Sequence, residues 1–290
     1  MSILITGSNG YLGSRYLTWC KKNKDVQILG LARTTPSDLN CDLLDLDALI
    51  LALKTLQEGS VIFHFAGSPY EKNISRLYKS FIQPTLNLIQ ASKYLKMNFK
   101  IILIGSAAEY GNLHTNPLKE DQLVKPCSNY GFIKSLQTEL AFSEALDNTD
   151  LICARIFNVV SGKEPNDLYF GRLMSAIERG DKVIETGNLD LVRDYLIEDD
   201  VFEALFQLYT KFNIAKNNIF NISSGTGINL RHLTQQIVQS LDSGIDIQET
   251  NLNFKPDIQT SIGDNSKIKK ITNLTLSSNV EKIINQFQIS

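Results

Sequence analysis

The chain has 290 residues, of which 43% are hydrophobic and 21% are charged, and its formal net charge at pH 7 is −2. This composition is typical of a globular protein with a large core, and the lack of a basic block argues against nucleic acid as the main partner. The four cysteines lack the CxxC or CxxH spacing of zinc sites, so we expect neither a metal centre nor a disulfide framework. We also expect no membrane-spanning segment and no secretory signal, which together with the reduced cysteines favours a cytoplasmic location.

Short apolar runs alternate with helical patterns over the first part of the chain. The runs predict strands at 2–6, 26–32, 61–66, 100–106 and 151–157. The helical patterns lie at 11–23, 45–57, 74–97 and 130–147. Because the predicted strands are apolar on successive residues, we expect helices to cover both faces of the sheet. Strands that alternate with helices predict right-handed crossovers and hence an α/β fold with a Rossmann-type, doubly wound parallel sheet.

From about residue 165 this alternation becomes less regular. Helical patterns at 168–180, 198–212 and 229–242 are interspersed with short strand candidates at 182–186 and 218–223. We therefore expect a Rossmann domain over 1–164 and a smaller α/β C-terminal lobe over 165–290, interleaved with the main sheet.

The first predicted strand is followed by three glycines within seven residues. In "LITGSNGYLG", Gly7, Gly10 and Gly13 have G-x-x-G-x-x-G spacing and stand between a strand and a helix. Gly7 allows a tight turn, Gly10 lets the backbone approach a pyrophosphate, and Gly13 lets the helix pack closely on the sheet. The free N–H groups at the start of the helix favour phosphate charge. The pattern therefore predicts a dinucleotide site, and an ordinary glycine-rich turn is the alternative.

The end of the second predicted strand indicates which dinucleotide is bound. An acidic residue there would bind the ribose 2′-hydroxyl of NAD, but the chain has Ala32 and Arg33. Since an arginine can pair with a 2′-phosphate, NADP(H) is favoured, NAD remains possible, and the alternative is a solvated surface arginine. Asp42 and Leu43 are placed to bracket the adenine.

Tyr130 and Lys134 in "NYGFIKS" lie one helical turn apart on the same face of a predicted helix. An ammonium group next to a phenol favours the phenolate, so Tyr130 could exchange a proton with a substrate oxygen near neutral pH. Ser106, at the end of a predicted strand, could donate a hydrogen bond to the same oxygen. Tyr-x-x-x-Lys alone is common by chance, and a solvated helix face is the alternative.

Six short motifs follow one another in the chain. They are T-G-x-x-G-[YF]-[LI]-G as Thr6 to Gly13, H-x-A-[AG] as His64 to Gly67, Ser106 four residues before Tyr110-Gly111, Tyr-x-x-x-Lys as Tyr130 and Lys134, R-x-x-N as Arg155 and Asn158, and R-D-[FY]-[IL] as Arg193 to Leu196. Together they resemble the extended short-chain dehydrogenase/reductase family, specifically its nucleotide-sugar epimerases, dehydratases and reductases. The resemblance covers nearly the whole chain and implies an NADP-binding first domain with a C-terminal lobe that binds a sugar nucleotide.

The resemblance also implies residue roles. The implied catalytic residues are Ser106, Tyr130 and Lys134. The implied cofactor-binding residues are Thr6, Gly7, Asn9, Gly10, Tyr11, Leu12, Gly13, Arg33, Asp42, Leu43, Phe65, Ala66, Gly67, Tyr130, Lys134 and Ile156. The implied substrate-binding residues are Ser106, Ala107, Asn158, Arg193 and Asp257. For Arg193 an ion pair with Asp194 or Asp199 is the alternative. His64 is interpreted as a packed histidine near the cofactor, and His114 and His232 as surface residues.

The residues after Ser106 narrow the implied reaction. Family dehydratases have an acidic residue there and the fucose-forming epimerase–reductases have a cysteine, but this chain has Ala107 and Ala108. What remains is hydride transfer at one carbon: an NADPH-dependent reductase of a nucleotide-linked 4-keto-6-deoxyhexose, a C4 epimerase with bound NAD or a decarboxylase-type oxidoreductase. A non-catalytic NADP-binding regulator is the alternative outside enzymes. Relatives often form homodimers through the helices predicted at 74–97 and 130–147, so we expect a homodimer.

Some positions depart from the pattern of the family. They are Phe81 and Pro84 in place of N-x-x-G-T, Ser161-Gly162 in place of Gly-Pro, and Lys255 in place of a late arginine. These departures predict an altered pocket, and a divergent member with weak activity is the alternative.

Overall fold

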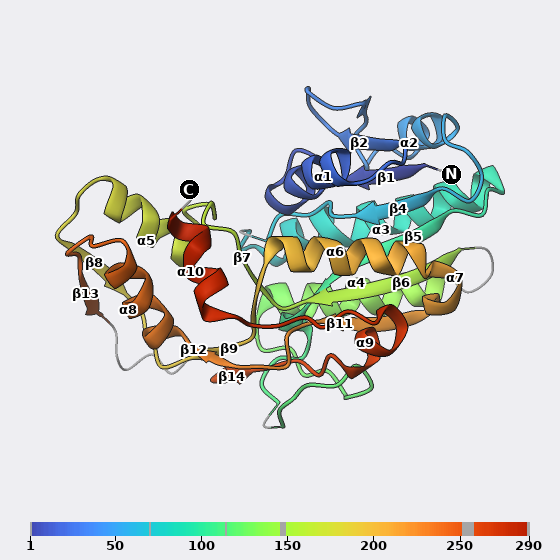
Figure 1. Cartoon of the computed structure of the whole chain (residues 1–290). Helices are drawn as coiled ribbons and strands as arrows, with labels where there is room; N and C mark the ends of the chain where they lie inside the picture. The colour runs from blue at the N-terminus through green and yellow to red at the C-terminus, as the bar shows by residue number, and fades with distance from the viewer. Residues whose placement is uncertain (1, 70, 114, 146–148, 251–257, 289–290) are drawn as a thin grey trace. The chain divides into compact units, whose positions relative to one another are not determined.

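The computed structural model describes residues 2–69, 71–113, 115–145, 149–250 and 258–288 (Figure 1). The chain forms two compact units and passes from one to the other several times. The first unit consists of Met1–Glu109, Ser128–Arg155 and Ala204–Phe220. The second consists of Tyr110–Cys127, Ile156–Glu203 and Asn221–Ser290.

The first unit is built on a seven-stranded sheet with the order β11-β6-β5-β4-β1-β2-β3. The strands are β1 (Ile3–Thr6), β2 (Ile28–Ala32), β3 (Leu39–Asn40), β4 (Val61–His64), β5 (Lys100–Ser106), β6 (Asp150–Ile156) and β11 (Asn218–Ile222). β1 pairs in parallel with both β2 and β4, and in the latter pair Thr6 lies opposite His64. The strand order reverses between β1 and β4, and ligands of such sheets bind at this point, outside the carboxyl ends of the strands.

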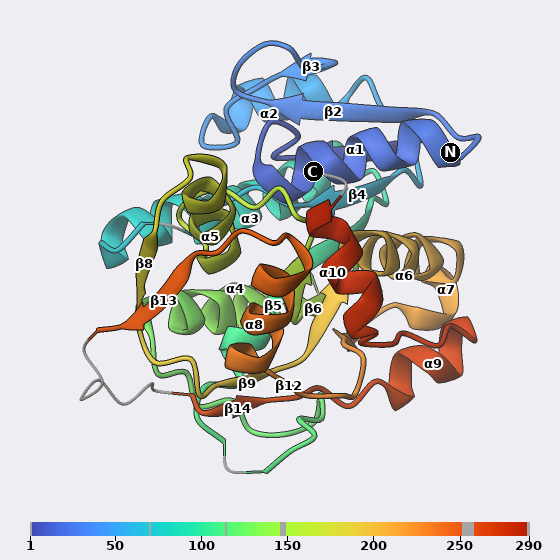
Figure 2. The same cartoon turned by 60° about the vertical axis from the view of Figure 1, so that its left-hand side comes forward.

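Helices cover both faces of this sheet (Figures 1 and 2). They are α1 (Tyr11–Asn23), α2 (Leu46–Leu53), α3 (Ile74–Leu95), the 3₁₀ turn η1 (Ala107–Glu109), α4 (Asn129–Ala145), α6 (Glu198–Thr210), which crosses in from the second unit, and α7 (Phe212–Ala215). The main core lies between the sheet and α2, α3 and α4, and includes Leu53, Leu88 and Ala141. On the other face, Tyr16 of α1 packs against Phe63 of β4. The predicted doubly wound parallel sheet is therefore confirmed.

Helix α3 runs without interruption through Pro84, one of the positions that departs from the family pattern. Asn73 caps its start by accepting hydrogen bonds from the N–H groups of Ser75 and Arg76. Beside Pro84, Phe81 is buried in a small apolar cluster with Leu77, Ile82 and Ile133. Of these departures, Phe81 therefore places an apolar side chain between α3 and α4.

The second unit contains short strands and amphipathic helices. Its strands are β7 (Asn158–Val160) paired with β10 (Tyr195–Ile197), β9 (Val192–Arg193) between β12 (Ile228–Asn229) and β14 (Thr260–Ser261), and β8 (Val183–Thr186) paired with β13 (Asp246–Glu249). Its helices are α5 (Tyr169–Glu178), α8 (Leu230–Ser240), α9 (Ser266–Thr272) and α10 (Val280–Gln288). The apolar faces of α5, α8 and α10 form a separate core around Phe170, Leu233 and Phe287. Across the described parts of the chain, no helix is both long and apolar enough to cross a membrane.

Candidate active site

The glycine turn lies at the carboxyl end of β1, against the segment that follows β4. Gly7 has a φ of +67°, and a Cβ atom there would be 2.8 Å from the backbone of Ala66. A Cβ atom on Gly13 would be 2.3 Å from the carbonyl oxygen of Gly7. Since no acidic side chain stands in the first turn of α1 and no side chain caps it, its N–H groups remain suited to an anion. The turn therefore has the close-packed, glycine-dependent shape that suits a dinucleotide pyrophosphate.

Two side chains of this turn form hydrogen bonds with neighbouring segments. Thr6 is fully buried, and its Oγ1 lies 2.8 Å from Nδ1 of His64. Asn9 is exposed, and its amide donates to the carbonyl oxygen of Thr34 at 2.7 Å, which ties the turn to the loop after β2. Tyr11 and Leu12 are half-buried in the first turn of α1.

The residues expected around the adenosine lie near the ends of β2 and β3. Arg33 is exposed, and within the described part of the chain no hydrogen bond or ion pair holds its guanidinium. Asp42 is also exposed and accepts a hydrogen bond from the N–H of Leu44. The side chain of Leu43 packs into the main core, and its carbonyl oxygen accepts from the amide of Asn87. Arg33 is therefore available to a ligand, whereas Leu43 presents mainly its backbone.

The three expected catalytic residues all belong to the first unit. Ser106 ends β5, and its hydroxyl oxygen accepts a hydrogen bond from the N–H of Ala108 at 3.2 Å. Helix α4 begins close to this segment, because a Cβ atom on Gly131 would be 2.4 Å from the carbonyl oxygen of Ala108. Lys134, on the same helix, donates to the carbonyl oxygen of Ile104 at 2.5 Å. These contacts attach the helix with Tyr130 and Lys134 to the end of the strand with Ser106.

Phe81 lies beside both functional side chains of α4. Its ring packs edge-to-face against that of Tyr130, with 5.8 Å between the centroids, and Nζ of Lys134 lies 4.9 Å from its centre. A Cβ atom on Gly67 would be 2.0 Å from the Phe81 ring, so this ring occupies space that only a glycine leaves open. Phe65 and Ala66, also expected at the cofactor, are half-buried in the same segment.

Burial dominates the electrostatics of this site. Lys134 is only 3% exposed, and burial lowers the pKa of its ammonium, against the opposing effect of the nearby Glu109 carboxylate. Burial also lowers the pKa of His64 to about 3, and the positive charge of Lys134 adds to this shift. His64 is therefore a neutral, packed histidine that bonds to Thr6 and Thr85, as the sequence indicated.

A buried ion pair that the sequence analysis did not anticipate supports this segment. Glu109 is fully buried and accepts hydrogen bonds from Nε of Arg155 at 2.9 Å, the N–H of Ser106 at 2.8 Å and the hydroxyl of Thr138 at 3.0 Å. Arg155, the first residue of the R-x-x-N motif, is therefore held in a buried ion pair. The sequence feature that could have predicted this ion pair is the lone arginine inside the apolar strand "LICARIF", because a buried charge requires a partner.

Two expected substrate-binding residues, Asn158 of β7 and Arg193 of β9, belong to the described part of the second unit. Asn158 donates to the carbonyl oxygen of Asp194 at 3.1 Å. The guanidinium of Arg193 donates to the carbonyl oxygens of Val192, Gln259 and Ile258 at 2.8–3.2 Å. Within the described residues it forms no ion pair, so the alternative of a salt bridge to Asp194 or Asp199 is wrong.

Asp194 instead supports a backbone loop of the second unit. Its buried carboxylate accepts from Ser224, Gly225 and Gly263, and burial raises its pKa despite these bonds.

The remaining expected residues have the following places. Ile156 is buried at the end of β6. Ala107 is half-buried in η1, and His232 is exposed, as expected. Asp257, Lys255 and His114 lie outside the described residues.

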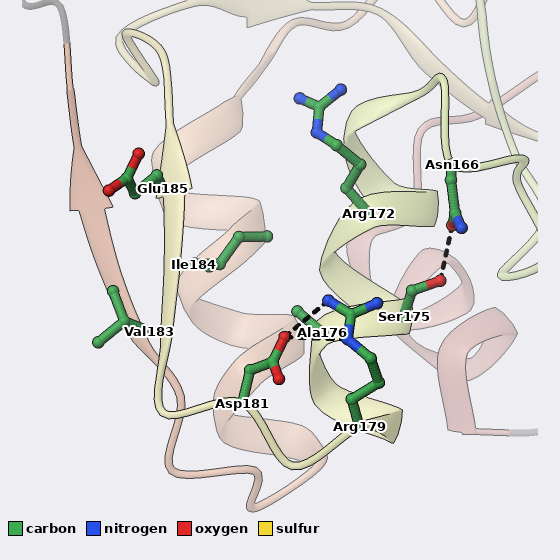
Figure 3. A pocket seen from close by; sticks show the side chains of 9 residues that line it. All are labelled: Asn166, Arg172, Ser175, Ala176, Arg179, Asp181, Val183, Ile184 and Glu185. Carbon is green, nitrogen blue, oxygen red and sulfur yellow. Dashed lines mark hydrogen bonds and ion pairs between the residues drawn. The ribbon is translucent and has the colours of Figure 1, made fainter.

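The second unit also has an open pocket of about 390 Å³ between α5 and β8 (Figure 3). Arg179 in its wall pairs with Asp181, and Ser175 donates to Asn166. None of the expected site residues lines this pocket. Where the structure describes the chain, no cluster of three histidine, cysteine, aspartate or glutamate side chains could hold a metal ion.

Two curated relatives match most of the chain. It is 23% identical over 277 residues to the GDP-6-deoxy-D-talose 4-dehydrogenase of Aggregatibacter actinomycetemcomitans, covering 93% of this chain and 91% of the relative. It is 27% identical over 263 residues to a UDP-glucose 4-epimerase of Mycoplasma genitalium, covering 78% of this chain and 77% of the relative.

Solved structures have the same fold. MoeE5 in complex with UDP-glucuronic acid and NAD matches with a TM-score of 0.86 at 20% identity, covering 99% of this chain and 97% of that one. RMD from Pseudomonas aeruginosa complexed with NADPH matches with a TM-score of 0.83 at 19% identity, covering 99% and 98%. The model of the NAD dependent epimerase/dehydratase family matches residues 3–223. On this match, and with its glycine turn, Tyr-x-x-x-Lys helix and parallel sheet, the chain belongs to the NAD-dependent epimerase/dehydratase family.

Proposed function

We propose that this protein is an NADPH-dependent reductase of the 4-keto group of a nucleotide-linked 4-keto-6-deoxyhexose. The observation that carries the proposal is the attachment of the Tyr130–Lys134 helix to the end of the Ser106 strand, with Ala107 and Ala108 directly after Ser106. The similarity to a GDP-6-deoxy-D-talose 4-dehydrogenase supports it, because oxidation of a hydroxyl at C4 is the reverse of reduction of a 4-ketone.

The proposed mechanism assigns one task to each side chain. A nicotinamide cofactor held by the glycine turn would supply the hydride for C4. The Ser106 hydroxyl donates a hydrogen bond to the ketone oxygen. The N–H of Ala108 donates to the Ser106 hydroxyl oxygen, and this bond helps to fix the direction of the hydroxyl. Tyr130 then transfers its phenolic proton to that oxygen as it becomes an alcohol. Lys134 has three N–H donors, and two of them have protein partners, Ile104 and Gln137. We propose that the third binds the nicotinamide ribose.

This mechanism predicts that the protein cannot make its own keto sugar. Elimination of water requires a base that removes the proton at C5, and neither Ala107 nor Ala108 can act as one. Incubation with GDP-mannose or dTDP-glucose alone should give no 4-keto-6-deoxy product, whereas adding the matching dehydratase should start NADPH consumption. Formation of the keto sugar by this protein alone would overturn the proposal.

A C4 epimerase with bound NAD is the second candidate, and the similarity to a UDP-glucose 4-epimerase favours it. The two candidates differ in their need for added cofactor. Interconversion of 4-hydroxy sugars by the purified protein with no cofactor added would indicate the epimerase, and turnover only with NADPH would indicate the reductase. A non-catalytic NADP-binding regulator would give neither result.

Arg33 is the proposed selector of NADPH over NADH. Its exposed guanidinium would pair with the 2′-phosphate, and a hydrogen bond to a charged group contributes about 1.5–3 kcal/mol. Arg33→Ala should therefore weaken NADPH binding about tenfold or more while changing NADH binding little, as measured by fluorescence titration. Arg179→Ala, which removes an exposed arginine in the second unit, is the control. Equal loss for both cofactors would contradict this assignment.

For the substrate we propose Asn158, Arg193 and Asp257 as contacts of the sugar nucleotide, with the Arg193 guanidinium on the diphosphate.

We also propose a homodimer through α3 and α4. Apolar side chains exposed on these helices, Tyr78, Tyr94 and Phe132, support it. Light scattering should then give twice the 32.5 kDa mass of the chain.

A further inference from the structure

A buried chain of hydrogen bonds joins the first strand to the catalytic helix within the first unit. Thr6 Oγ1 lies 2.8 Å from Nδ1 of His64, and Nε2 of His64 lies 3.0 Å from Oγ1 of Thr85. Thr85 Oγ1 accepts from Nε2 of Gln137 at 2.8 Å, and Oε1 of Gln137 accepts from Nζ of Lys134. All five side chains are at most 3% exposed, so water does not compete for these bonds.

Chemistry determines the direction of every bond in this chain. The ammonium of Lys134 can only donate, so Gln137 presents its oxygen to it and its NH₂ to Thr85 and the carbonyl oxygen of Phe81. Thr85 uses its one hydrogen on the same carbonyl, at 2.7 Å. Its oxygen must therefore accept from Nε2–H of His64, and Nδ1 of His64 must accept from Thr6. A neutral imidazole is required, in agreement with the low pKa of His64.

The orientation of the Gln137 amide is fixed by its neighbours in this chain of hydrogen bonds. If the amide rotated, its NH₂ would face an ammonium and its oxygen would face a carbonyl, and both contacts are repulsive. A buried polar group left without a partner is strongly disfavoured, so the loss of one bond in the chain would weaken the bonds beside it. Since a neutral amide stands between Thr85 and Lys134, the chain positions groups rather than conducting protons.

We propose that Gln137 is the positioning residue of Lys134, and that its amide is held in place from the glycine turn through Thr6, His64 and Thr85. The inference rests on the proposed role of Lys134. With its side-chain oxygen, Gln137 keeps the ammonium charged and directed, and together with Ile104 it occupies two of the three N–H donors. Nothing in the Tyr-x-x-x-Lys motif specifies the residue three positions after the lysine.

The titratable groups around Lys134 determine in which pH range the titration of Lys134 can test the proposal. Glu109 belongs to η1 and pairs with Arg155 of β6, Cys153 also belongs to β6, His64 belongs to β4, and Tyr130 precedes Lys134 on α4. Burial raises the pKa of Cys153 to about 12, and that of His64 is about 3. Neither Cys153 nor His64 changes charge between about pH 5 and pH 10, so neither disturbs a titration of Lys134 in this interval.

The test is a ¹³C NMR titration of protein labelled at the lysine Cε, with the Lys134 signal identified by its loss in Lys134→Met. Gln137→Met keeps the volume and removes the acceptor, so the midpoint should fall by about one pH unit. Gln137→Glu places a carboxylate there, so the midpoint should rise. Gln83→Met, the same exchange at a half-buried glutamine of α3 that bonds to Asn87, should leave it unchanged. An unchanged midpoint in Gln137→Met, or shifts of the same sign in both variants, would overturn the proposal.

Thr85 provides a second route to the same measurement if the Gln137 variants do not fold. Thr85→Val removes the hydroxyl that holds the amide and should also lower the midpoint, whereas Thr85→Ser keeps the oxygen and should restore the wild-type value. A wild-type midpoint in a folded Thr85→Val protein would contradict the proposed chain.

This titration requires neither substrate nor cofactor, so its result is independent of the proposed function. If the midpoints shift as expected but no keto sugar is reduced, the proposed function fails and the positioning role of Gln137 stands. If NADPH-dependent turnover is found but the midpoint of Gln137→Met is that of the wild type, the positioning role fails alone.

Discussion

Replacing Tyr130 by phenylalanine is expected to lower kcat by a factor of about 10²–10⁴, the range that a positioned general acid contributes. In the proposed mechanism the phenol acts on the substrate oxygen, so the variant should bind NADPH almost as tightly as the wild type. The ring itself stays, and its edge-to-face contact with Phe81 should preserve the fold. Coupled turnover of a dehydratase product and fluorescence titration of NADPH measure the two quantities separately.

Tyr209→Phe is the matched control, since it removes a phenol from α6 in the same unit. It should leave both kcat and NADPH affinity unchanged. Near-normal turnover in Tyr130→Phe would exclude the proton-donor role. Equal loss of cofactor binding and turnover would instead indicate that Tyr130 mainly shapes the cofactor site.

The second large effect concerns stability. Glu109→Gln should lower the free energy of unfolding by about 3–5 kcal/mol, because it leaves the guanidinium of Arg155 buried without its counter-charge. The variant should also lower turnover, because the single amide oxygen of glutamine cannot replace both carboxylate oxygens, one of which accepts from the N–H of Ser106 and the other from Nε of Arg155. Urea unfolding followed by circular dichroism measures the loss. It is a large part of the 5–15 kcal/mol by which native proteins are typically stable.

Glu144→Gln is the control, because Glu144 pairs with Lys93 at the surface, and its loss should cost less than about 1 kcal/mol. Removing both buried charges should be milder than removing one. The Glu109→Leu/Arg155→Met double variant should therefore be more stable than Glu109→Leu alone. Equal effects of Glu109→Gln and Glu144→Gln would show that the buried pair does not carry the stability assigned to it.

Local patterns predicted most of the first unit. The predicted helix at 11–23 has these bounds, and the predicted strand at 100–106 is β5. Several predicted elements were too long. For example, the strand expected to reach residue 66 ends at His64, and the helix expected to reach residue 57 ends at Leu53. In the first case the chain leaves the sheet toward Gly67, whose backbone the Phe81 ring contacts closely. That contact joins residues far apart in the sequence.

The glycine turn and the Tyr-x-x-x-Lys helix could be recognised because each is a short-range requirement of the backbone. A positive φ at Gly7 and the spacing of Tyr130 and Lys134 on one helix face depend only on neighbouring residues. The roles of Glu109, Arg155 and Gln137 could not be recognised in this way. Each depends on partners from other strands and helices, and without those partners the residues look like an ordinary surface glutamate, a motif arginine and a polar helix position.

The sequence by itself therefore determined the parallel sheet, the glycine turn and the Tyr-x-x-x-Lys pair on one helix, since periodicity and spacing along the chain encode them. Only the tertiary structure decided that Arg155 pairs with Glu109 and that Gln137 bonds both to Lys134 and to Thr85, which in turn bonds to His64. The physical reason is burial. A charge or amide removed from water must find its partner within the core, and which partner it finds depends on how distant segments pack together.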